Sequence, residues 1–307
     1  MRLDRLDLNL IIALEAILRL RSVSGAASEL NLTQPAMSRS LGRLREHFRD
    51  PIVVQVGRQM QPTEFGVRLY RTGGRLLNEV RNFSQMRPDF DPTQARRTFS
   101  LMASDFVLKV WIAPMLARLS EAAPGVSLSV VPIDQTSDAR FTRGEIDFAV
   151  VPDRFLFAEH PHRFMFSDAF VCVFWAGNTA IGDTLDVDNY LSLRHVVTTF
   201  GSAWRGSHFE HWMEERQEPL KVACSLPSFS LLADCLTGTP WIATIHRSLW
   251  DSLPEGVPLR ALPHPLPLPE IVENLQWHRS RQDDDSIAWM RDFILTRGAP
   301  DEAAPQD

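Results

Sequence analysis

A short stretch near the amino end carries side chains that could bind the edges of nucleic-acid bases. Gln34, Ser38 and Arg39 stand at spacings that place them on one side of a helix, and Arg43 follows four residues later. Glutamine can form two hydrogen bonds with adenine and arginine two with guanine, while serine can bond to a base or a phosphate. The stretch therefore predicts contact with DNA, and a solvated surface helix with a charged face is the alternative.

A second group of side chains could hold a metal ion. His208, His211 and Glu214 recur at three-residue spacing within a predicted helix, and imidazole with carboxylate is a common ligand set for zinc. The same pattern also describes an exposed polar helix face. The sequence contains no G-x-S-x-G, P-loop, G-x-G-x-x-G or H-E-x-x-H motif. The alternative function, a metal-dependent or small-molecule-binding enzyme, therefore depends on the region of His208 and His211.

A third group lies where predicted strands give way to helices or turns. In open α/β sheets, ligands bind beyond the carboxyl ends of the strands, where helix amino ends present free N–H groups to anions. Many of the side chains at these joins are aromatic, although each aromatic ring could equally belong to the core. The predicted binding residues are Ser104, Asp105, Phe106, Phe200, Gly201, Ser202, Ser228, Phe229 and His246.

The elements that position the first group follow from the spacing of apolar residues. Residues 8–18 have a helical period, and a short second helix follows, with Ser24 as its predicted cap. After a tight turn at residues 31–32, Thr33 is a suitable N-cap and Pro35 fits the first helical turn. The apolar stripe of this third helix is Met37, Leu41, Leu44 and Phe48. Two short helices joined in this way form a helix-turn-helix pattern, whose second helix can enter the major groove.

Two further elements follow this pattern. The run "RDPIVVQVGRQMQPT" predicts a β-hairpin wing with Arg58 near its tip. The next segment predicts a long helix with a roughly heptad seam, in which Gly73-Gly74 indicates either a close partner helix or a bend. The seam residues are Phe65, Leu69, Leu76, Val80 and Phe83. The run "RPDFDPTQARR" then predicts a hinge, because it has two prolines and no apolar period.

Beyond the hinge, strands and helices alternate, which predicts α/β sheets. Predicted strands are "TFSLMAS", "VSLSVVPI", "IDFAVVP", "AFVCVFWA", "HVVTTF" and "EIVENLQWHRS". Predicted helices are "DFVLKVWIAPMLARLSEAAPG", "SDARFTRG", "GSHFEHWMEERQ" and "DDDSIAWMRDFILTRG". The last residues, "APDEAAPQD", form a polar tail that is predicted to be disordered.

Charge is divided unevenly along the 307 residues. Residues 1–97 hold 16 Arg and 10 acidic residues, whereas the remainder holds 16 basic and 28 acidic residues. A basic first part points to nucleic acid. Three cysteines without C-x-x-C spacing argue against a disulfide framework or a zinc site, and no apolar run reaches the length of a membrane span. We therefore expect a cytoplasmic protein without a membrane anchor.

The stretch from Leu6 to Gly66, including "LNLTQPAMSRSLGRLR" and the downstream "PTEFG", resembles the DNA-binding domain of LysR-type transcriptional regulators. It is most similar to the branch of nodulation and aromatic-catabolism regulators. The resemblance implies that Gln34, Pro35, Ser38 and Arg39 read bases. The full predicted DNA-binding set is Thr33, Gln34, Pro35, Ser38, Arg39, Arg43 and Arg58, the last two contacting the DNA backbone. Gln55 replaces an arginine that the family usually has in the wing, which weakens or removes one phosphate contact.

The resemblance also implies a fold and a division of the chain. The expected fold is an N-terminal α-helical winged helix-turn-helix with a linker helix, followed by a two-lobed α/β effector domain like a periplasmic binding protein. The expected parts are a DNA-binding domain 1–64, a linker helix 65–88 that pairs two chains, a hinge 89–97, an effector domain 98–298 and a disordered tail 299–307. Lobe I would comprise about 98–163 and 271–298, and lobe II about 169–262, with crossings near 163–169 and 262–271.

The function implied is that of a transcriptional regulator rather than an enzyme. Its expected partners are double-stranded promoter DNA, RNA polymerase, a small-molecule inducer and further copies of itself, as a dimer of dimers. No cofactor and no metal are expected beyond the co-inducer. The aromatic surroundings and the branch resemblance favour a small aromatic inducer, either uncharged or acidic, held between the lobes at the family's usual effector positions. The inducer, the operator and the choice between activation and repression stay open.

Overall fold

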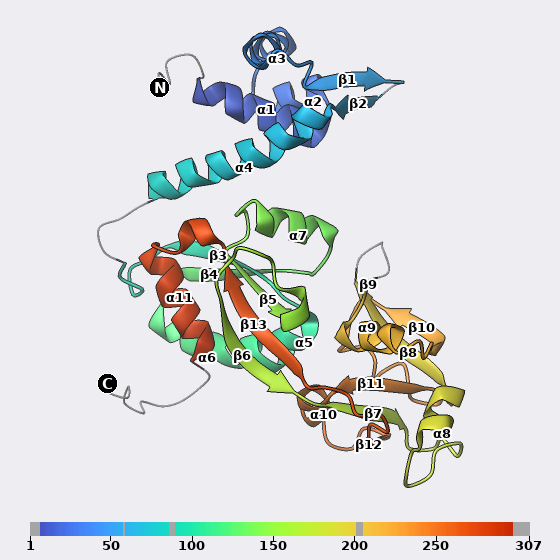
Figure 1. Ribbon diagram of the computed structural model, residues 1–307. Coiled ribbons are helices and arrows are strands. Elements are labelled where there is room, and N and C mark those ends of the chain that lie inside the picture. The colour runs from blue at the N-terminus through green and yellow to red at the C-terminus, as the bar shows by residue number, and fades with distance from the viewer. Residues whose placement is uncertain (1–6, 58, 86–89, 201–204, 297–307) are drawn as a thin grey trace. The chain divides into compact units, whose positions relative to one another are not determined.

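The computed structural model describes residues 7–57, 59–85, 90–200 and 205–296. The chain separates into two compact units, Met1–Arg87 and Pro88–Asp307, which are treated one at a time (Figure 1). The fold class expected from the sequence is confirmed: helices with a small wing and a linker helix come first, and two mixed α/β sheets follow.

The first unit consists of four helices and a two-stranded hairpin. Asp7 caps the first helix by accepting a hydrogen bond from the backbone N of Asn9 at 2.9 Å. The alanines of the second helix are buried, so that the first three helices enclose one apolar core that includes Ile17, Met37 and Leu44. The elements are α1 (Leu8–Leu20), α2 (Val23–Glu29), α3 (Gln34–Phe48), β1 (Val53–Val56), β2 (Gln59–Pro62) and α4 (Glu64–Gln85).

The prediction that Ser24 caps the second helix was wrong. The N-cap of α2 is Ser22, whose hydroxyl accepts a hydrogen bond from the backbone N of Gly25 at 3.0 Å. Ser24 lies inside the first turn of α2 instead, because the chain leaves α1 through Arg21 in the left-handed conformation and enters the next helix at once. Asn31, with φ of 53°, forms the predicted tight turn before α3.

The predicted seam of α4 is divided between two environments. Phe65 packs edge-on against Phe48, and Leu69 contacts the core of its own unit. Leu76, Val80 and Phe83 are exposed, Phe83 by 77%. Gly73 faces α1 of the same chain, where an added Cβ would meet Ile11 at 3.6 Å. Gly73 therefore belongs to the contact between α4 and α1 of the same chain.

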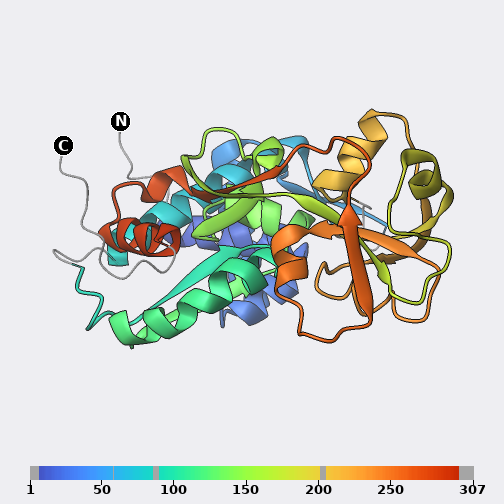
Figure 2. The ribbon, with the colours of Figure 1, turned by 90° about the horizontal axis from the view of Figure 1, so that it is seen from below.

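The second unit contains two mixed sheets (Figures 1 and 2). In lobe I the strand order is β4-β3-β5-β13-β6, and in lobe II it is β10-β8-β11-β7-β12, with β9 paired to β8. The strands of lobe I are β3 (Arg97–Met102), β4 (Val126–Val131), β5 (Phe148–Pro152), β6 (His162–Asp168) and β13 (Ile271–Trp277). Those of lobe II are β7 (Phe170–Trp175), β8 (Arg194–Phe200), β9 (Arg205–Gly206), β10 (Lys221–Leu226), β11 (Ile242–His246) and β12 (Leu259–Pro263).

Helices cover both sheets. Those of lobe I are α5 (Asp105–Val107), the π-helical segment η1 (Leu108–Ile112), α6 (Ala113–Ala122), α7 (Gln135–Thr142) and α11 (Asp285–Leu295), with single turns η2 (Asp153–Phe155) and η3 (Arg279–Arg281). Those of lobe II are α8 (Val187–Ser192), α9 (His208–Glu215) and α10 (Arg247–Asp251). The indole N–H of Trp111 in η1 donates to the carbonyl of Ile294 at 2.8 Å. This bond fixes the η1–α6 run beside α11 (Figure 2).

The first expected crossing between the lobes is itself a strand. Residues 162–168 form β6, which pairs antiparallel with β13 and extends lobe I to Asp168. The step into lobe II is Ala169 alone, because β7 begins at Phe170. The carboxylate of Asp168 accepts a hydrogen bond from the backbone N of Ser248 at 3.1 Å and so holds the start of α10 at this step. The return crossing lies between β12 and β13.

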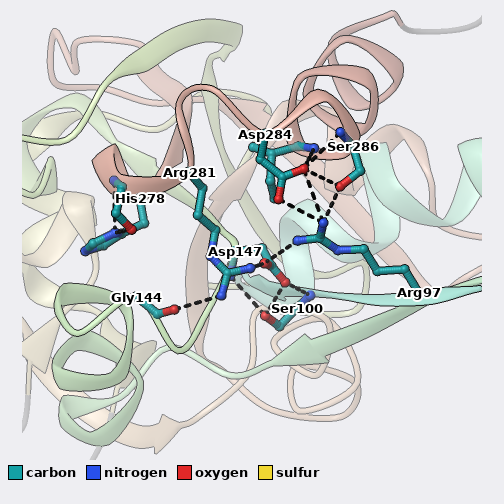
Figure 3. A network of polar contacts seen from close by, with 10 residues as sticks. Arg97, Ser100, Gly144, Asp147, His278, Arg281, Asp284 and Ser286 are labelled. Carbon is teal, nitrogen blue, oxygen red and sulfur yellow. Dashed lines mark hydrogen bonds and ion pairs between the residues drawn. The ribbon is translucent and has the colours of Figure 1, made fainter. Parts of the chain in front are cut away.

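A buried ion-pair network ties the sheet of lobe I to its last helix (Figure 3). The carboxylate of Asp147, just before β5, accepts hydrogen bonds from the backbone N of Ser100 at 2.7 Å, from its hydroxyl at 2.8 Å, and from Arg281. Arg97 joins Asp147 at 3.4 Å and Asp284, the N-cap of α11, at 3.0 Å. The network thus connects β3, β5, η3 and α11 within one lobe.

Candidate DNA interface and ligand cavity

The exposed face of α3 is set by how the helix is anchored. The hydroxyl of Thr33 caps the helix by accepting a hydrogen bond from the backbone N of Ala36 at 3.4 Å. Met37 and Leu44 have no exposed surface and Leu41 only 4%, so the helix cannot rotate without exposing this stripe. The side chains on the other face are all exposed: Gln34, Pro35, Ser38, Arg39 and Arg43, with Thr33 at its start.

The charge on this face is positive and available. Within the described residues, Arg39 and Arg43 take part in no salt bridge, so their guanidinium groups are free to meet an anion. Arg45 forms hydrogen bonds within its own unit instead. Its guanidinium donates to the carbonyls of Pro51 at 2.8 Å and Val53 at 3.0 Å, which attaches the base of the wing to α3.

The wing is a two-stranded antiparallel hairpin, as expected. Its base is held by Asp50, whose carboxylate accepts from the backbone N of Ile52 at 2.6 Å and from the hydroxyl of Thr63 at 2.7 Å. The side-chain amide of Gln55 donates a hydrogen bond to the carbonyl of Gly57 at 3.3 Å. Arg58, the predicted contact at the tip, lies outside the described residues.

A cavity of about 440 Å³ lies within the second unit and is lined by residues of both lobes. Its volume falls within the usual range for small-molecule sites. The lining residues are Ser104, Ile133, Asp138, Val151, Pro152, Arg154, Phe155, Leu156, Phe157, Ala158, Phe200, Ser207, His208, Phe229, His246, Ile271 and Glu273. Most of these side chains are apolar, so the cavity favours a ligand with an apolar body.

Four of the predicted effector residues line this cavity: Ser104, Phe200, Phe229 and His246. Phe106 does not line it. This ring is fully buried and stacks beneath His246 with the two centroids 3.7 Å apart. Gly201 and Ser202 lie outside the described residues. Whether these side chains contact a ligand stays a prediction, but the rule about strand ends located the cavity.

Asp105 and Ser228 join the lobes instead of lining the cavity. The carboxylate of Asp105 accepts hydrogen bonds from the hydroxyl of Ser228 at 2.7 Å and from the backbone N atoms of Phe229 at 3.0 Å and Ser230 at 2.7 Å. Burial opposes the ionisation of Asp105, but these hydrogen bonds outweigh it and lower the pKa of the carboxyl. We call this the Asp105 clamp. It connects the start of α5 in lobe I to the loop after β10 in lobe II.

Glu273 was not identified from the sequence as a cavity residue, and His208 was considered only as a possible metal ligand. Glu273 in β13 is 3% exposed, and burial with the nearby charge of Asp153 raises the pKa of its carboxyl to about 8. Burial also lowers the pKa of His208, and lowers that of His246 to about 3. All three groups are therefore largely uncharged at neutral pH.

The residues that were considered as possible metal ligands have other surroundings. His208, the first residue of α9, lines the cavity, whereas Nδ1 of His211 pairs with the carbonyl of Ser207 at 3.0 Å. The described part of the chain contains no group of three His, Cys, Asp or Glu residues placed to hold a metal ion. None of its helices is both long and apolar enough to cross a membrane.

Two family models match the chain and together cover most of it. Residues 8–67 match the model for the bacterial regulatory helix-turn-helix protein, lysR family, which spans α1 to the start of α4. Residues 92–299 match the model for the LysR substrate binding domain, which spans both lobes.

The chain is also similar to known proteins over nearly its whole length. The chain is 35% identical to Nodulation protein D 3 of Rhizobium meliloti (strain 1021) over 308 residues, covering 100% of this chain and 98% of that protein. It is 34% identical to Nodulation protein D 1 of Rhizobium tropici, covering 96% of each. A solved structure of a probable transcriptional regulator from Pseudomonas aeruginosa has a TM-score of 0.65 at 29% identity, covering 96% of this chain and 98% of that one. Full-length CbnR complexed with its target DNA has a TM-score of 0.61 at 10% identity, with 94% and 99% covered, and shares the fold.

Proposed function

The chain belongs to the LysR family of DNA-binding transcriptional regulators with a substrate-binding domain, and from that premise we propose that a small effector in the cavity controls how it occupies promoter DNA. The observation that carries the DNA part is the exposed face of α3, on which Gln34, Ser38 and Arg39 lie together while the opposite stripe is buried. Membership of this family sets aside the enzyme alternative raised by His208 and His211.

In this proposal α3 enters the major groove, with Arg39 contacting a base and Arg43 a phosphate. Arg39→Ala is expected to reduce affinity for the cognate promoter site by about 1–3 kcal/mol and to relax the preference at one base position. Arg43→Ala, on the same face one turn later, is the matched control. It is expected to weaken all sequences alike and to reduce the salt dependence by the contribution of about one phosphate.

The measurement is a titration of each variant against a library of operator sequences at two salt concentrations. If both variants lose affinity uniformly across the library, Arg39 is a phosphate contact and the assigned base reading is wrong. If neither variant alters binding to any sequence, α3 is not the DNA-binding element.

The effector part of the proposal is supported by the apolar cavity, which is lined by residues of both lobes. The chain passes between the lobes at Ala169 and again between β12 and β13. The lobes also meet through the Asp105 clamp, the Arg154–Glu215 ion pair and the stacked rings of Phe106 and His246. A ligand that contacts both lobes can favour one angle between them. We expect that change to alter the spacing of the DNA-binding units and their contact with RNA polymerase. A footprint whose length no cavity-binding compound alters would contradict this.

We also propose that the chain works as a dimer of dimers on a dyad-symmetric site. The exposed stripe of Leu76, Val80 and Phe83 on α4 supports pairing through this helix. Light scattering at micromolar concentration is expected to give about four times the chain mass of 34.8 kDa. A monomeric mass would contradict the proposal.

A further inference from the structure

The cavity contains several buried polar atoms that have no hydrogen-bond partner among the residues that the structure describes. They are Oε2 of Glu273, both ring nitrogens of His208 and Nδ1 of His246. Glu273 and His246 are almost completely buried, at 3% and 1% exposure. Buried polar atoms in folded proteins are nearly always hydrogen-bonded, so a concentration of unpartnered ones around one cavity indicates that something else completes their bonds.

We propose that the cavity selects an uncharged ligand, with an apolar body and a group that both accepts and donates hydrogen bonds, and that Glu273 and His208 recognise this group. The inference rests on the proposed function, because it assigns a ligand class to the same cavity. It narrows the expectation of an aromatic inducer that is either uncharged or acidic.

The charges around the cavity disfavour an anion. Among the described residues that line it, Arg154 is the only arginine or lysine, and its guanidinium already pairs with Glu215. Asp138 and Glu273 are acidic lining residues, and Asp153 lies close enough to influence Glu273. A ligand carboxylate would therefore lose its hydration among carboxyl groups without gaining an unpaired cation.

The proton on Glu273 gives the site its hydrogen-bonding character. A protonated carboxyl donates through its hydroxyl and accepts through its carbonyl oxygen, whereas a carboxylate only accepts. A neutral imidazole likewise offers one donor and one acceptor. Because the pKa of Glu273 is raised to about 8 and the pKa of His208 is lowered, both groups keep these mixed roles at pH 7. An amide, or a hydroxyl beside a carbonyl, matches them.

The rest of the wall accommodates an apolar body. Phe200 and Phe229 of lobe II meet edge to face with their centroids 5.6 Å apart, which offers a ring both a face and an edge. Ile133 lies on the lobe I side of the same cavity. A ligand that fills this space while bonding to Glu273 contacts both lobes, as the proposed control requires.

The test compares two fragments of equal shape, 4-methoxybenzamide and 4-methoxybenzoate, by calorimetric titration into the full chain. The amide is uncharged and the benzoate is ionised throughout the pH range used. We expect the amide to bind at least about tenfold more tightly at pH 7, since only the benzoate brings an uncompensated charge into the cavity. Ile133→Trp, whose added ring would occupy the cavity, is expected to abolish binding of the amide.

A pH series isolates Glu273. Between pH 7 and pH 9 the affinity of the wild-type chain for the amide is expected to fall about tenfold, because the protonated fraction of a carboxyl with a pKa near 8 falls by that factor. The other charged or titratable groups that face it are Asp138, Asp153, Arg154, His208 and His246. Glu273→Gln retains all five and cannot ionise, so its affinity is expected to stay level over the same range.

Three results would overturn the inference: tighter or equal binding of the benzoate, no binding of the amide, or the same pH profile in Glu273→Gln as in the wild-type chain. Promoter protection by the same preparations reports separately on the proposed function. A chain that protects promoter DNA but prefers the benzoate loses the inference and keeps the regulator. A chain that prefers the amide but protects no promoter keeps the inference about the cavity and loses the proposed control of DNA.

Discussion

Asp147→Asn is expected to lower the free energy of unfolding of the second unit by about 3–5 kcal/mol. Asp147 is 4% exposed and is the anion that compensates the charge of Arg281, whose other hydrogen bond runs to the carbonyl of Gly144 at 3.1 Å. Arg97 keeps Asp284 as a partner. The substitution therefore leaves the buried guanidinium of Arg281 without a counter-charge. Removing only one partner of a buried ion pair is strongly destabilising.

Tryptophan fluorescence during denaturant unfolding measures this loss in the correct unit. All eight tryptophans lie beyond residue 97: Trp111, Trp175, Trp204, Trp212, Trp241, Trp250, Trp277 and Trp289. Glu145→Gln is the matched control, because Glu145 is a nearby carboxylate in more exposed pairs with Arg140 and Arg143, and we expect it to cost less than about 1 kcal/mol. Equal losses in the two variants would show that the network contributes no more than surface pairs do.

Glu273→Gln is expected to change the free energy of unfolding of the second unit by an amount that depends on pH. The substitution is expected to be more stabilising at pH 8 than at pH 5 by about 2–4 kcal/mol. Folding raises the pKa of Glu273 from the ordinary 4.5 to about 8. The folded chain therefore binds a proton that the unfolded chain has released. The contribution of this group to stability is complete below pH 4.5 and is lost as the pH rises through about 8. Glutamine cannot ionise and so removes that loss.

The measurement is the difference in unfolding free energy between wild type and Glu273→Gln at several pH values, again followed by tryptophan fluorescence. Because His208 and His246 have lowered pKa values, their contributions decline on the acid side, below the ordinary histidine pKa of about 6.5. They are present in both chains and cancel in the difference. A difference that does not change between pH 5 and pH 8 would mean that Glu273 is ionised in the folded chain.

The DNA-binding unit was predicted well because its signals are local. The stripe of Met37, Leu41 and Leu44, with Thr33 as cap, fixes which face of α3 is exposed, and all of these residues lie within one helix and its cap. The cap of α2 was missed by two residues, since Ser22 and Ser24 fit the preference equally well. The choice between them depends on where α1 ends, and a left-handed Arg21 leaves no mark in the sequence.

The cavity was predicted in outline and missed in its chemistry. Strand ends located Ser104, Phe200, Phe229 and His246, because a strand end is visible in the local pattern. Glu273 was missed because its environment is not local. Its strand pairs with β5 and β6, more than a hundred residues earlier, across a register shift beside Glu273 itself. A charged residue between apolar neighbours in "EIVENLQW" was the available signal, and it did not show on which side the carboxyl would be buried.

The position of β13 has a consequence for how the chain is made. Lobe I is bridged by this strand, which lies between β5 and β6 and yet comes after the whole of lobe II in the sequence. A ribosome adds about 5–20 residues per second. Roughly 5–25 s therefore pass between the synthesis of β5 and β6 and the synthesis of β13, the strand that pairs with both. The helical head is a compact unit formed by the first 87 residues, and it has no such delay. A nascent chain therefore carries a folded DNA-binding head before its effector lobe can close. Interruption of synthesis before Ile271 leaves that head attached to a lobe whose two strands cannot meet.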